Sequence, residues 1–286
     1  MDLADRVGLQ AVFQEFRIGA VLHFAAFAYV GESMRAPAEY FRNNVVNTLN
    51  LLDAMRDANI NQIVFSSTCA TYGVPEWTPM TEQHPQKPVN PCGESKLMVE
   101  RVLDWYGRAY GLQWSALRHF NAAGADPHEQ LGEAHEPETH LIPLAIEAAC
   151  GDGPELQVFG TDYQTPDGTA VRDYIHVSDL ASAHVSTLER LARTGKSDAL
   201  NLGTGRGHSV REVIEKVEQV TKRKVPLKNC PRRSGDPAVL VADASYAGRE
   251  LGWVAKHSSL DEIIETAWRW HSRSRTTVQQ SGQGSA

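Results

Sequence analysis

The chain has 286 residues, 42% of them hydrophobic, and is therefore long enough to bury the core of one large domain or of one domain with a smaller lobe. Its net charge of −7 and its mixed charge distribution argue against a nucleic-acid-binding surface, which would carry a basic stripe. No apolar stretch is long enough to cross a bilayer, and the first residues lack the apolar core of a signal peptide. The four cysteines, at positions 69, 92, 150 and 230, show no paired spacing, which predicts a reduced, cytoplasmic protein.

The first half of the chain alternates predicted strands and helices. The elements expected in chain order are a strand at 20–26, a helix at 37–58, a strand at 63–67, a helix at 94–110 and a strand at 114–120. The strands are short apolar runs of the kind buried in parallel sheets, and Gly111 suits the stop of the second helix. This rhythm predicts right-handed crossovers and an α/β fold with a parallel sheet.

The rhythm breaks after Asn121. A long loop is expected at 123–138, and the remainder mixes short strands with helices, two of which open with capping boxes at Ser209 and Ser259. We interpret this half as a smaller α/β substrate lobe. The predicted domains are a dinucleotide-binding remainder at 1–121, a mainly sugar-binding lobe at 122–271 with segments that return to the first sheet, and a disordered tail at 272–286.

Two patterns resemble a dinucleotide-binding loop and a metal site, but the spacing of their residues supports neither kind of site. The sequence GTGRG at 203–207 lies between a strand and a helix, but the dinucleotide fingerprint needs glycine where His208 stands, so a tight turn is favoured over a phosphate cradle. His128, His135 and His140 have glutamates nearby, but their spacing fits no standard metal motif. A polar loop explains them, and no metal is expected.

Eight segments in order along nearly the whole chain resemble the UDP-glucose 4-epimerases of the extended short-chain dehydrogenase/reductase family. They are HFAA at 23–26, VGES at 30–33, NNV at 43–45, FSSTCATYG at 65–73, NPCGESK at 90–96, RHFN at 118–121, GTAVRDYIHV at 168–177 and RRSGD at 232–236. The resemblance implies a doubly wound, Rossmann-like parallel sheet, NAD as cofactor and UDP-glucose and UDP-galactose as substrates.

The resemblance also implies how the catalytic residues act. In this family a tyrosine phenolate, paired with a lysine four residues later, removes the proton of the sugar 4-hydroxyl while bound NAD takes the hydride. The keto sugar then rotates and is reduced on its other face. Lys96 matches the lysine, Thr68 matches the hydroxyl that bonds the reacting sugar oxygen, and Cys92 stands at the tyrosine position. The competing interpretations are a solvated charge for Lys96 and a strand-end hydroxyl that caps backbone for Thr68. The related dehydratases place an Asp-Glu pair at 69–70, where this chain has Cys-Ala.

Further positions match the family's binding residues. On the cofactor side these are Asp2, Leu3, Phe24, Asn43, Ser66, Lys96 and Phe120. On the substrate side they are Thr68, Asn121, Leu141, Phe159, Arg172, Arg233 and Asp236. Guanidinium groups bind phosphate oxygens in pairs, which suits the two arginines to a diphosphate, although each could also be a surface ion-pair partner. For the two phenylalanines taken alone, core packing is the favoured interpretation.

Two departures from the family bear on activity. A thiolate at Cys92, beside Lys96, would form more easily than a phenolate. Its sulfur sits on a single methylene, however, and so lies too far from the proton of the sugar 4-hydroxyl, and a water molecule would have to relay this proton. A small buried cysteine without a role is the alternative. His119 also replaces the tyrosine expected before Phe-Asn.

Upstream of Asp2 the family has two βα units of roughly 60 residues with the glycine loop. We expect a miscalled start or a fragment, and an exposed apolar edge at the strand 20–26.

The leading interpretation is a UDP-glucose 4-epimerase homologue. One alternative is a UDP-pentose 4-epimerase, which the same motifs permit. The other is a catalytically inactive UDP-sugar-binding pseudoenzyme or fragment, favoured by Cys92 and the absent glycine loop. A homodimer is expected from the family, through the helices near 43–58 and 94–110. Acceptance of N-acetylhexosamines depends on pocket volume beside the sugar, where Leu240 is the candidate residue.

Overall fold

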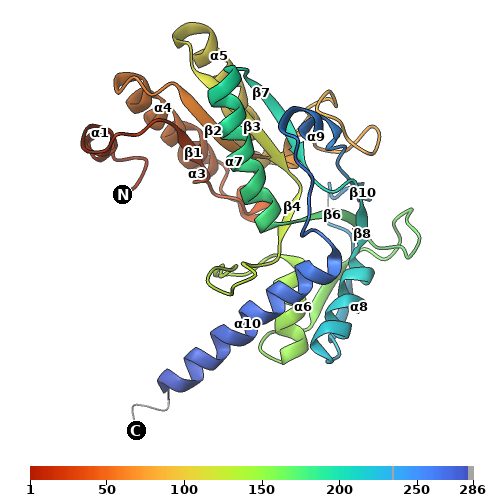
Figure 1. The fold of residues 1–286 in the computed structure, drawn as a ribbon. Coiled ribbons are helices and arrows are strands. Elements are labelled where there is room, and N and C mark those ends of the chain that lie inside the picture. Colours follow the sequence, from red (N-terminus) through yellow and green to blue (C-terminus); the bar gives the residue numbers. More distant parts are fainter. Residues whose placement is uncertain (234, 283–286) are drawn as a thin grey trace. The chain divides into compact units, whose positions relative to one another are not determined.

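The computed structural model describes residues 1–233 and 235–282, with side chains described up to Arg273 (Figure 1). The chain forms two compact units. The first comprises Met1–His119, Ser182–Leu202 and Ala244–Trp253, and the second comprises Phe120–Ala181, Gly203–Asp243 and the chain from Val254 onward. Ser234, in the predicted RRSGD motif, and residues 283–286 of the predicted tail lie outside the described residues.

The first unit is built on a four-stranded parallel sheet in the order β1-β2-β3-β7 (Figure 1). Its strands are β1 (Val21–His23), β2 (Gln62–Thr68), β3 (Gln113–His119) and β7 (Asp198–Leu202). The three strands predicted in this half are confirmed, with ends shifted by one to three residues. The parallel α/β fold predicted from their rhythm is confirmed as well, and strand β7 joins the sheet from much later in the chain.

Helices surround this sheet. They are α1 (Arg6–Glu15), α2 (Val30–Ser33), α3 (Pro37–Tyr40), α4 (Asn47–Asp57), α5 (Pro91–Tyr110), α9 (Ser245–Leu251) and the part of α7 (Val177–Thr194) from Ser182 onward. The core joins Leu52 and Met55 of α4 and Val99 and Leu103 of α5 to Phe65 of β2, all at most 1% exposed. Helices α4 and α5 therefore cover the same face of the sheet.

The helix predicted at 37–58 is interrupted by a π-helical turn, Phe41–Val46. Within this turn Asn44 is 2% exposed, and its side chain leaves the helix to bond other segments. Its Nδ2 donates to the Phe27 carbonyl at 3.0 Å and to Ser95 Oγ at 2.9 Å, and its Oδ1 accepts from the Phe27 N–H at 2.8 Å. Asn44 thereby ties the loop after β1 to helix α5.

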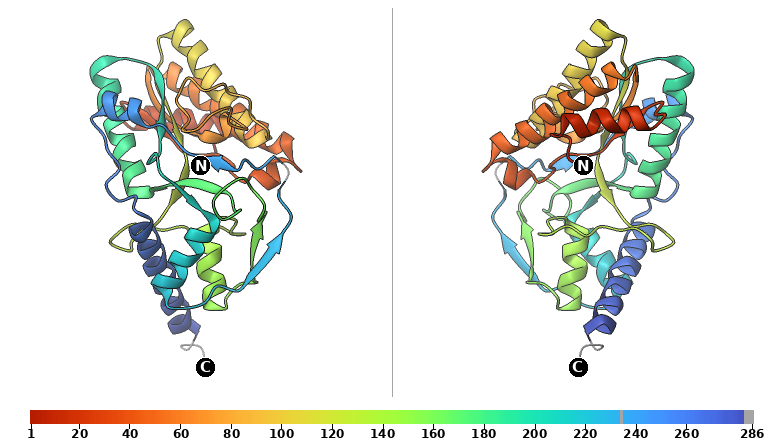
Figure 2. Two further views of the ribbon diagram at one scale, coloured as in Figure 1. Left: turned by 90° about the vertical axis from the view of Figure 1, so that its right-hand side faces the viewer. Right: turned by 90° about the vertical axis from the view of Figure 1, so that its left-hand side faces the viewer.

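The second unit holds two small sheets. The strands β10 (Val239–Leu240), β6 (Val171–His176) and β4 (Asn121–Ala123) are parallel neighbours in that order, and β8 (Gly207–Ser209) pairs antiparallel with β6. The strands β5 (Leu156–Phe159) and β9 (Leu227–Cys230) form a separate parallel pair (Figure 2). Helices α6 (Leu141–Cys150), α8 (Val210–Thr221) and α10 (Leu260–Gly282) pack side by side through a common apolar core (Figure 2).

The predicted helix starts are found at both capping boxes, and the predicted disordered tail is wrong in part. Ser209 and Glu212 make both bonds of the box, and Ser259 Oγ accepts the N–H of Glu262 at 3.2 Å. Helix α10 continues to Gly282, so residues 272–282 are helical. A helix that has already nucleated adds one hydrogen bond for each further residue, and no proline follows to stop it. No helix in the described part of the chain is both long and apolar enough to cross a membrane.

The glycine-rich sequence after β7 forms the tight turn predicted for it. The backbone N–H groups of this turn donate hydrogen bonds to a carboxylate of the protein itself. Asp173 of β6 is fully buried. Its Oδ1 accepts from the Thr204 N–H at 2.9 Å, and its Oδ2 accepts from the N–H groups of Gly205 at 3.0 Å and Ala242 at 3.2 Å. Gly205 has a φ of +73°, a conformation that glycine adopts without strain. The turn therefore binds an internal anion, and its amides are not available to a phosphate.

Candidate functional site

The residues at the catalytic positions of the family lie on the first unit, around the start of α5. Asn90 caps this helix by accepting the Gly93 N–H at 2.9 Å, and Pro91 fills its first position. Cys92 and Lys96 follow one helical turn apart and so point from the same face. Lys96 is 7% exposed, and its Nζ donates to the Ser66 carbonyl at 2.8 Å. Burial lowers the pKa of Lys96 to about 8.

Cys92 lies in an environment that disfavours its thiolate. The residue is 5% exposed, and its Sγ lies 3.9 Å from the Phe27 carbonyl oxygen. Burial raises the pKa of the Cys92 thiol, and the charge of Lys96 opposes this only in part. The easy thiolate expected from the sequence is therefore not supported, because desolvation outweighs the neighbouring cation.

Thr68 ends β2, where its side chain caps the following turn. Its Oγ1 accepts the Ala70 N–H at 3.2 Å, and its carbonyl accepts from Thr71 Oγ1 at 3.0 Å. The capping interpretation thus describes an actual contact. A hydroxyl that accepts one hydrogen bond still has its own hydrogen to donate, so capping leaves Thr68 able to bond a substrate oxygen. Across from Thr68 on β3, His119 Nε2 lies 2.8 Å from Ser66 Oγ.

The other cofactor-side positions are dispersed. Phe24 follows β1 and is 55% exposed, which contradicts core packing, and its ring centroid lies 4.6 Å from that of His184. Asn43 donates to Asn44 Oδ1 at 3.0 Å. Phe120, which belongs to the second unit, is 3% exposed, so for this residue core packing describes the structure.

Of the two cofactor-side positions at the start of the chain, Asp2 makes a local contact and Leu3 packs on the first unit. Asp2 is exposed, and its Oδ1 accepts the Ala4 N–H at 2.8 Å. Leu3 packs against the core of the first unit, and its carbonyl accepts from Asn50 Nδ2 at 3.2 Å. An apolar hollow of about 460 Å³ lies beside Leu3, β1 and Phe24. The apolar edge expected at this strand is therefore open in the described chain.

A buried ion pair that sequence reasoning missed supports the carboxyl ends of β2 and β3. Arg118 and Glu100 are 6% and 5% exposed, and Arg118 Nη2 lies 2.6 Å from Glu100 Oε2. Ser67 Oγ donates to Glu100 at 2.5 Å, and Arg118 Nη1 donates to Tyr72 Oη at 3.0 Å. The only sequence signal was an arginine inside an apolar strand, which needs a buried partner because an isolated charge is costly to desolvate.

In the second unit, six of the seven positions predicted for substrate line one cavity of about 510 Å³. They are Asn121, Leu141, Phe159, Arg172, Arg233 and Asp236. These residues come from the ends of β4 and β5, from β6, from the first turn of α6 and from the segment after β9. Thr68, the seventh, belongs to the first unit. A cavity of this size suits a small organic ligand.

The two arginines that line this cavity have different kinds of partner. Arg172 forms an ion pair with Asp236 and donates from Nη1 to the Val171 carbonyl at 2.8 Å. The guanidinium carbon of Arg233 lies 3.9 Å from the ring centroid of Phe159, a cation–π contact. Among the described side chains, no carboxylate pairs with Arg233. An anionic group entering the cavity would therefore find a guanidinium that is not yet neutralised.

Known proteins of one family match nearly the whole chain. A family model described as GDP-mannose 4,6 dehydratase matches residues 1–267. The chain is 49% identical over 270 residues to a UDP-glucose 4-epimerase of Halalkalibacterium halodurans, covering 94% of this chain and 81% of the relative. The chain belongs to the UDP-glucose 4-epimerase family. The family's fold, predicted from the resemblance, is confirmed, and the UDP-pentose alternative is not favoured.

Solved structures of the epimerase family agree. A UDP-glucose 4-epimerase from Brucella ovis in complex with NAD has a TM-score of 0.92 at 50% identity, covering 94% of this chain and 83% of that one. The epimerase from Bifidobacterium longum, in complex with NAD+ and UDP, has a TM-score of 0.90 at 40% identity, covering 96% and 82%.

Proposed function

We propose that this epimerase-family chain binds UDP-glucose and UDP-galactose and interconverts them at sugar C4 with NAD as cofactor. The observation that carries the proposal is the cavity of the second unit, which is lined by the six positions that resemble the family's UDP-sugar contacts. Support for the substrates comes from relatives named UDP-glucose 4-epimerase and from one such enzyme solved with NAD+ and UDP.

The residues of the first unit fit part of NAD. Lys96 is a buried ammonium with three N–H donors, one of which reaches the Ser66 carbonyl, so hydroxyls of a ribose are suitable acceptors for the others. Phe24, Ser66 and Thr68 lie at or after the carboxyl ends of parallel strands, where doubly wound sheets bind their ligands. The chain has no G-x-G-x-x-G sequence for the pyrophosphate. NAD, when bound, would supply the hydride acceptor and donor for sugar C4.

The chain's own groups would handle the proton. Thr68 would donate its hydroxyl hydrogen to the reacting sugar oxygen, and Lys96 would favour an anion beside it. Cys92 occupies the position of the general base, but its buried thiol keeps its proton near neutral pH. We therefore propose that loss of the base, rather than loss of substrate binding, limits the rate.

The test is conversion of UDP-galactose to UDP-glucose by the full chain with added NAD, alongside Cys92→Tyr and Cys92→Phe. General base catalysis contributes about 10²–10⁴-fold, so Cys92→Tyr is expected to raise the rate by at least about 100-fold. Cys92→Phe has the same bulk without an ionisable group and should stay at the parent rate. A folded Cys92→Tyr chain that binds UDP but gains no activity would contradict the proposed turnover.

A second candidate is a UDP-sugar-binding protein without turnover, favoured by the protonated thiol at Cys92. It predicts that calorimetry detects UDP-glucose binding while neither NAD binding nor conversion is measurable in the parent or in Cys92→Tyr. The same pair of measurements therefore separates the two functions.

We also propose that the chain acts in the cytoplasm as a homodimer. Its four cysteines are free thiols, as expected in a reducing compartment. Met98 and Trp105, seven residues apart on α5, are 38% and 65% exposed, and Val46 of the neighbouring π-helical turn is 49% exposed. Exposed apolar side chains at helical spacing suit the packing of α5 against a second copy. Light scattering should give twice the mass of the chain, and Trp105→Glu should reduce it to one.

A further inference from the structure

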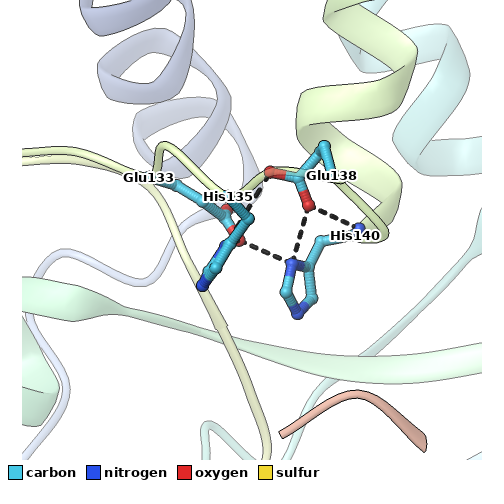
Figure 3. A group of neighbouring side chains, drawn as sticks. All are labelled: Glu133, His135, Glu138 and His140. Atoms are coloured by element: carbon cyan, nitrogen blue, oxygen red, sulfur yellow. Dashed lines mark hydrogen bonds and ion pairs between the residues drawn. The ribbon is translucent and has the colours of Figure 1, made fainter. Parts of the chain in front are cut away.

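The loop before α6 gathers four side chains of the kinds that bind metal ions. Glu133, His135, Glu138 and His140 each offer one donor atom, and these four atoms all lie within 4.8 Å of one another (Figure 3). We call them the His–Glu cluster. In Figure 3 both carboxylates and the His140 ring point toward a common centre, and the His135 ring lies beside Glu133. The spacing E-x-H-x-x-E-x-H fits no standard motif, so the sequence did not reveal this convergence.

The distances within the His–Glu cluster are close to those around a bound ion. His140 Nδ1 lies 2.6 Å from Glu133 Oε1 and 2.9 Å from Glu138 Oε1, and His135 Nδ1 lies 2.9 Å from Glu133 Oε1. Ligand bonds of about 2.0–2.2 Å put the donors of a tetrahedral zinc ion roughly 3.3 Å apart. Rotamer adjustments of several tenths of an ångström would therefore open the centre to an ion.

The backbone already fixes one of the carboxylates. Glu138 Oε1 accepts the N–H groups of Thr139 at 2.6 Å and His140 at 2.8 Å, and its side chain is 8% exposed. Bonds of this kind orient a ligand before the metal arrives and strengthen binding. Two carboxylates and two neutral imidazoles carry a total charge of −2, which balances a divalent cation.

We propose that the His–Glu cluster binds one divalent transition-metal ion, with zinc as the best match to two imidazoles and two carboxylates in four-coordinate geometry. The role of the ion would be structural, through its position beside the cavity. Glu133, Glu138 and His140 also line the 510 Å³ cavity, and His140 directly precedes Leu141 in its wall. A bound ion would therefore fix the loop that forms one side of this cavity.

A proton competes for the same centre. The hydrogen bond to Glu133, and to a smaller extent the one to Glu138, raises the pKa of His140 to about 10. Without metal, His140 is therefore an imidazolium paired with these carboxylates, and a metal ion must displace its proton in order to bind. A second group, Cys150, Asp152 and His271, also has three donors within 4.8 Å and would be a rival site. An experiment must therefore distinguish zinc at the His–Glu cluster from zinc at Cys150, and both from an ion pair without metal.

The test is calorimetric titration of zinc into the EDTA-treated full chain at pH 7.5, without nucleotide. One equivalent should bind to the parent. His135→Ala/His140→Ala should weaken binding by at least about 100-fold, since outer-sphere changes alone cost 10–100-fold. His128→Ala, an exposed histidine of the same loop, and Cys150→Ser should bind like the parent. Because no nucleotide is present, the outcome is independent of the proposed epimerase activity.

Cobalt gives a readout that does not depend on a variant remaining folded. Cobalt bound at the His–Glu cluster should show visible absorption typical of tetrahedral nitrogen and oxygen ligands, without the near-ultraviolet band of a cobalt–thiolate bond. No zinc binding by the parent would overturn the proposal and leave an ion-pair cluster only. Zinc binding as tight as in the parent by a folded His135→Ala/His140→Ala variant would overturn it as well. So would a cobalt–thiolate band in the parent that disappears in the Cys150→Ser variant.

Discussion

Two sets of charged residues, one beside β2 and β3 in the first unit and one at the cavity of the second unit, differ in burial. In the first unit Lys96, Glu100 and Arg118 are 7%, 5% and 6% exposed, and each is held by neighbouring strands and helices. In the second unit Arg233 is exposed and Asp236 is half-buried at the cavity. Buried charges are costly unless paired, whereas charges at a cavity remain ready for a ligand. Substitutions in the buried Glu100–Arg118 pair should therefore change mainly stability, and those of the cavity arginines should change mainly binding.

The largest effect is expected from Arg118→Met. It leaves the Glu100 carboxylate buried without its partner, which should cost about 3–5 kcal/mol in the free energy of unfolding. Urea denaturation measures this change. The control is Arg108→Met, whose partner Asp104 is exposed, and exposed pairs contribute only about 0–1 kcal/mol. Equal losses in the two variants would show that burial does not distinguish them.

A somewhat smaller effect concerns pH and Lys96. The folded chain titrates this lysine at about 8, while the unfolded chain does so near 10.4. Between these values the unfolded chain binds more protons, so the free energy of unfolding rises with pH. The shift corresponds to about 3 kcal/mol of destabilisation, present below pH 8 and relieved above about pH 10.4.

Lys96→Met should lack this contribution to the pH dependence. Urea denaturation at pH 7.5, 9 and 10.5 gives the difference between parent and variant, in which the contribution of the Cys92 thiol largely cancels. The parent should gain about 3 kcal/mol on the variant across this range. A difference that stays constant with pH would mean that the lysine is not desolvated.

The smallest effect on stability, with a clear effect on affinity, is expected from Arg233→Ala. Hydrogen bonds to charged groups contribute about 1.5–3 kcal/mol, so UDP should bind about 10–100-fold more weakly while the melting temperature stays close to that of the parent. Arg232→Ala is the matched control, because Arg232 pairs with exposed Asp162 and does not line the cavity. Equal weakening of UDP binding by both variants would indicate a general charge effect.

Local signals predicted the elements of the first unit well. The predicted stop of α5 at Gly111 is confirmed, and this residue has a left-handed φ of +73°, whereas the predicted start at 94 lies three residues after the true start, which Asn90 and Pro91 form. The pairing of Glu100 with Arg118 was not predictable, because it requires the packing of α5 against β2 and β3. The direction of the Cys92 pKa shift also depends on burial, which the sequence left open as one of two interpretations.

In the second unit, the predicted substrate positions came from the family resemblance, and their roles remain predictions. The spacing of residues 133–140 could not reveal the His–Glu cluster, because the course of an irregular loop decides which side chains converge. The extension of helix α10 to Gly282 was also not predicted from the sequence. It follows from propagation of a helix that begins in an apolar core, and the polar composition of residues 272–282 does not reveal this.

The carboxylate of Asp173 also bears on how the protein is made. It accepts hydrogen bonds from the Thr204–Gly205 turn and from Ala242, which lie 31 to 69 residues later in the chain. A buried carboxylate without donors is strongly destabilised, so β6 gains its full stability only after Ala242 has been synthesised. While the ribosome is still translating this stretch, the second unit therefore remains incomplete.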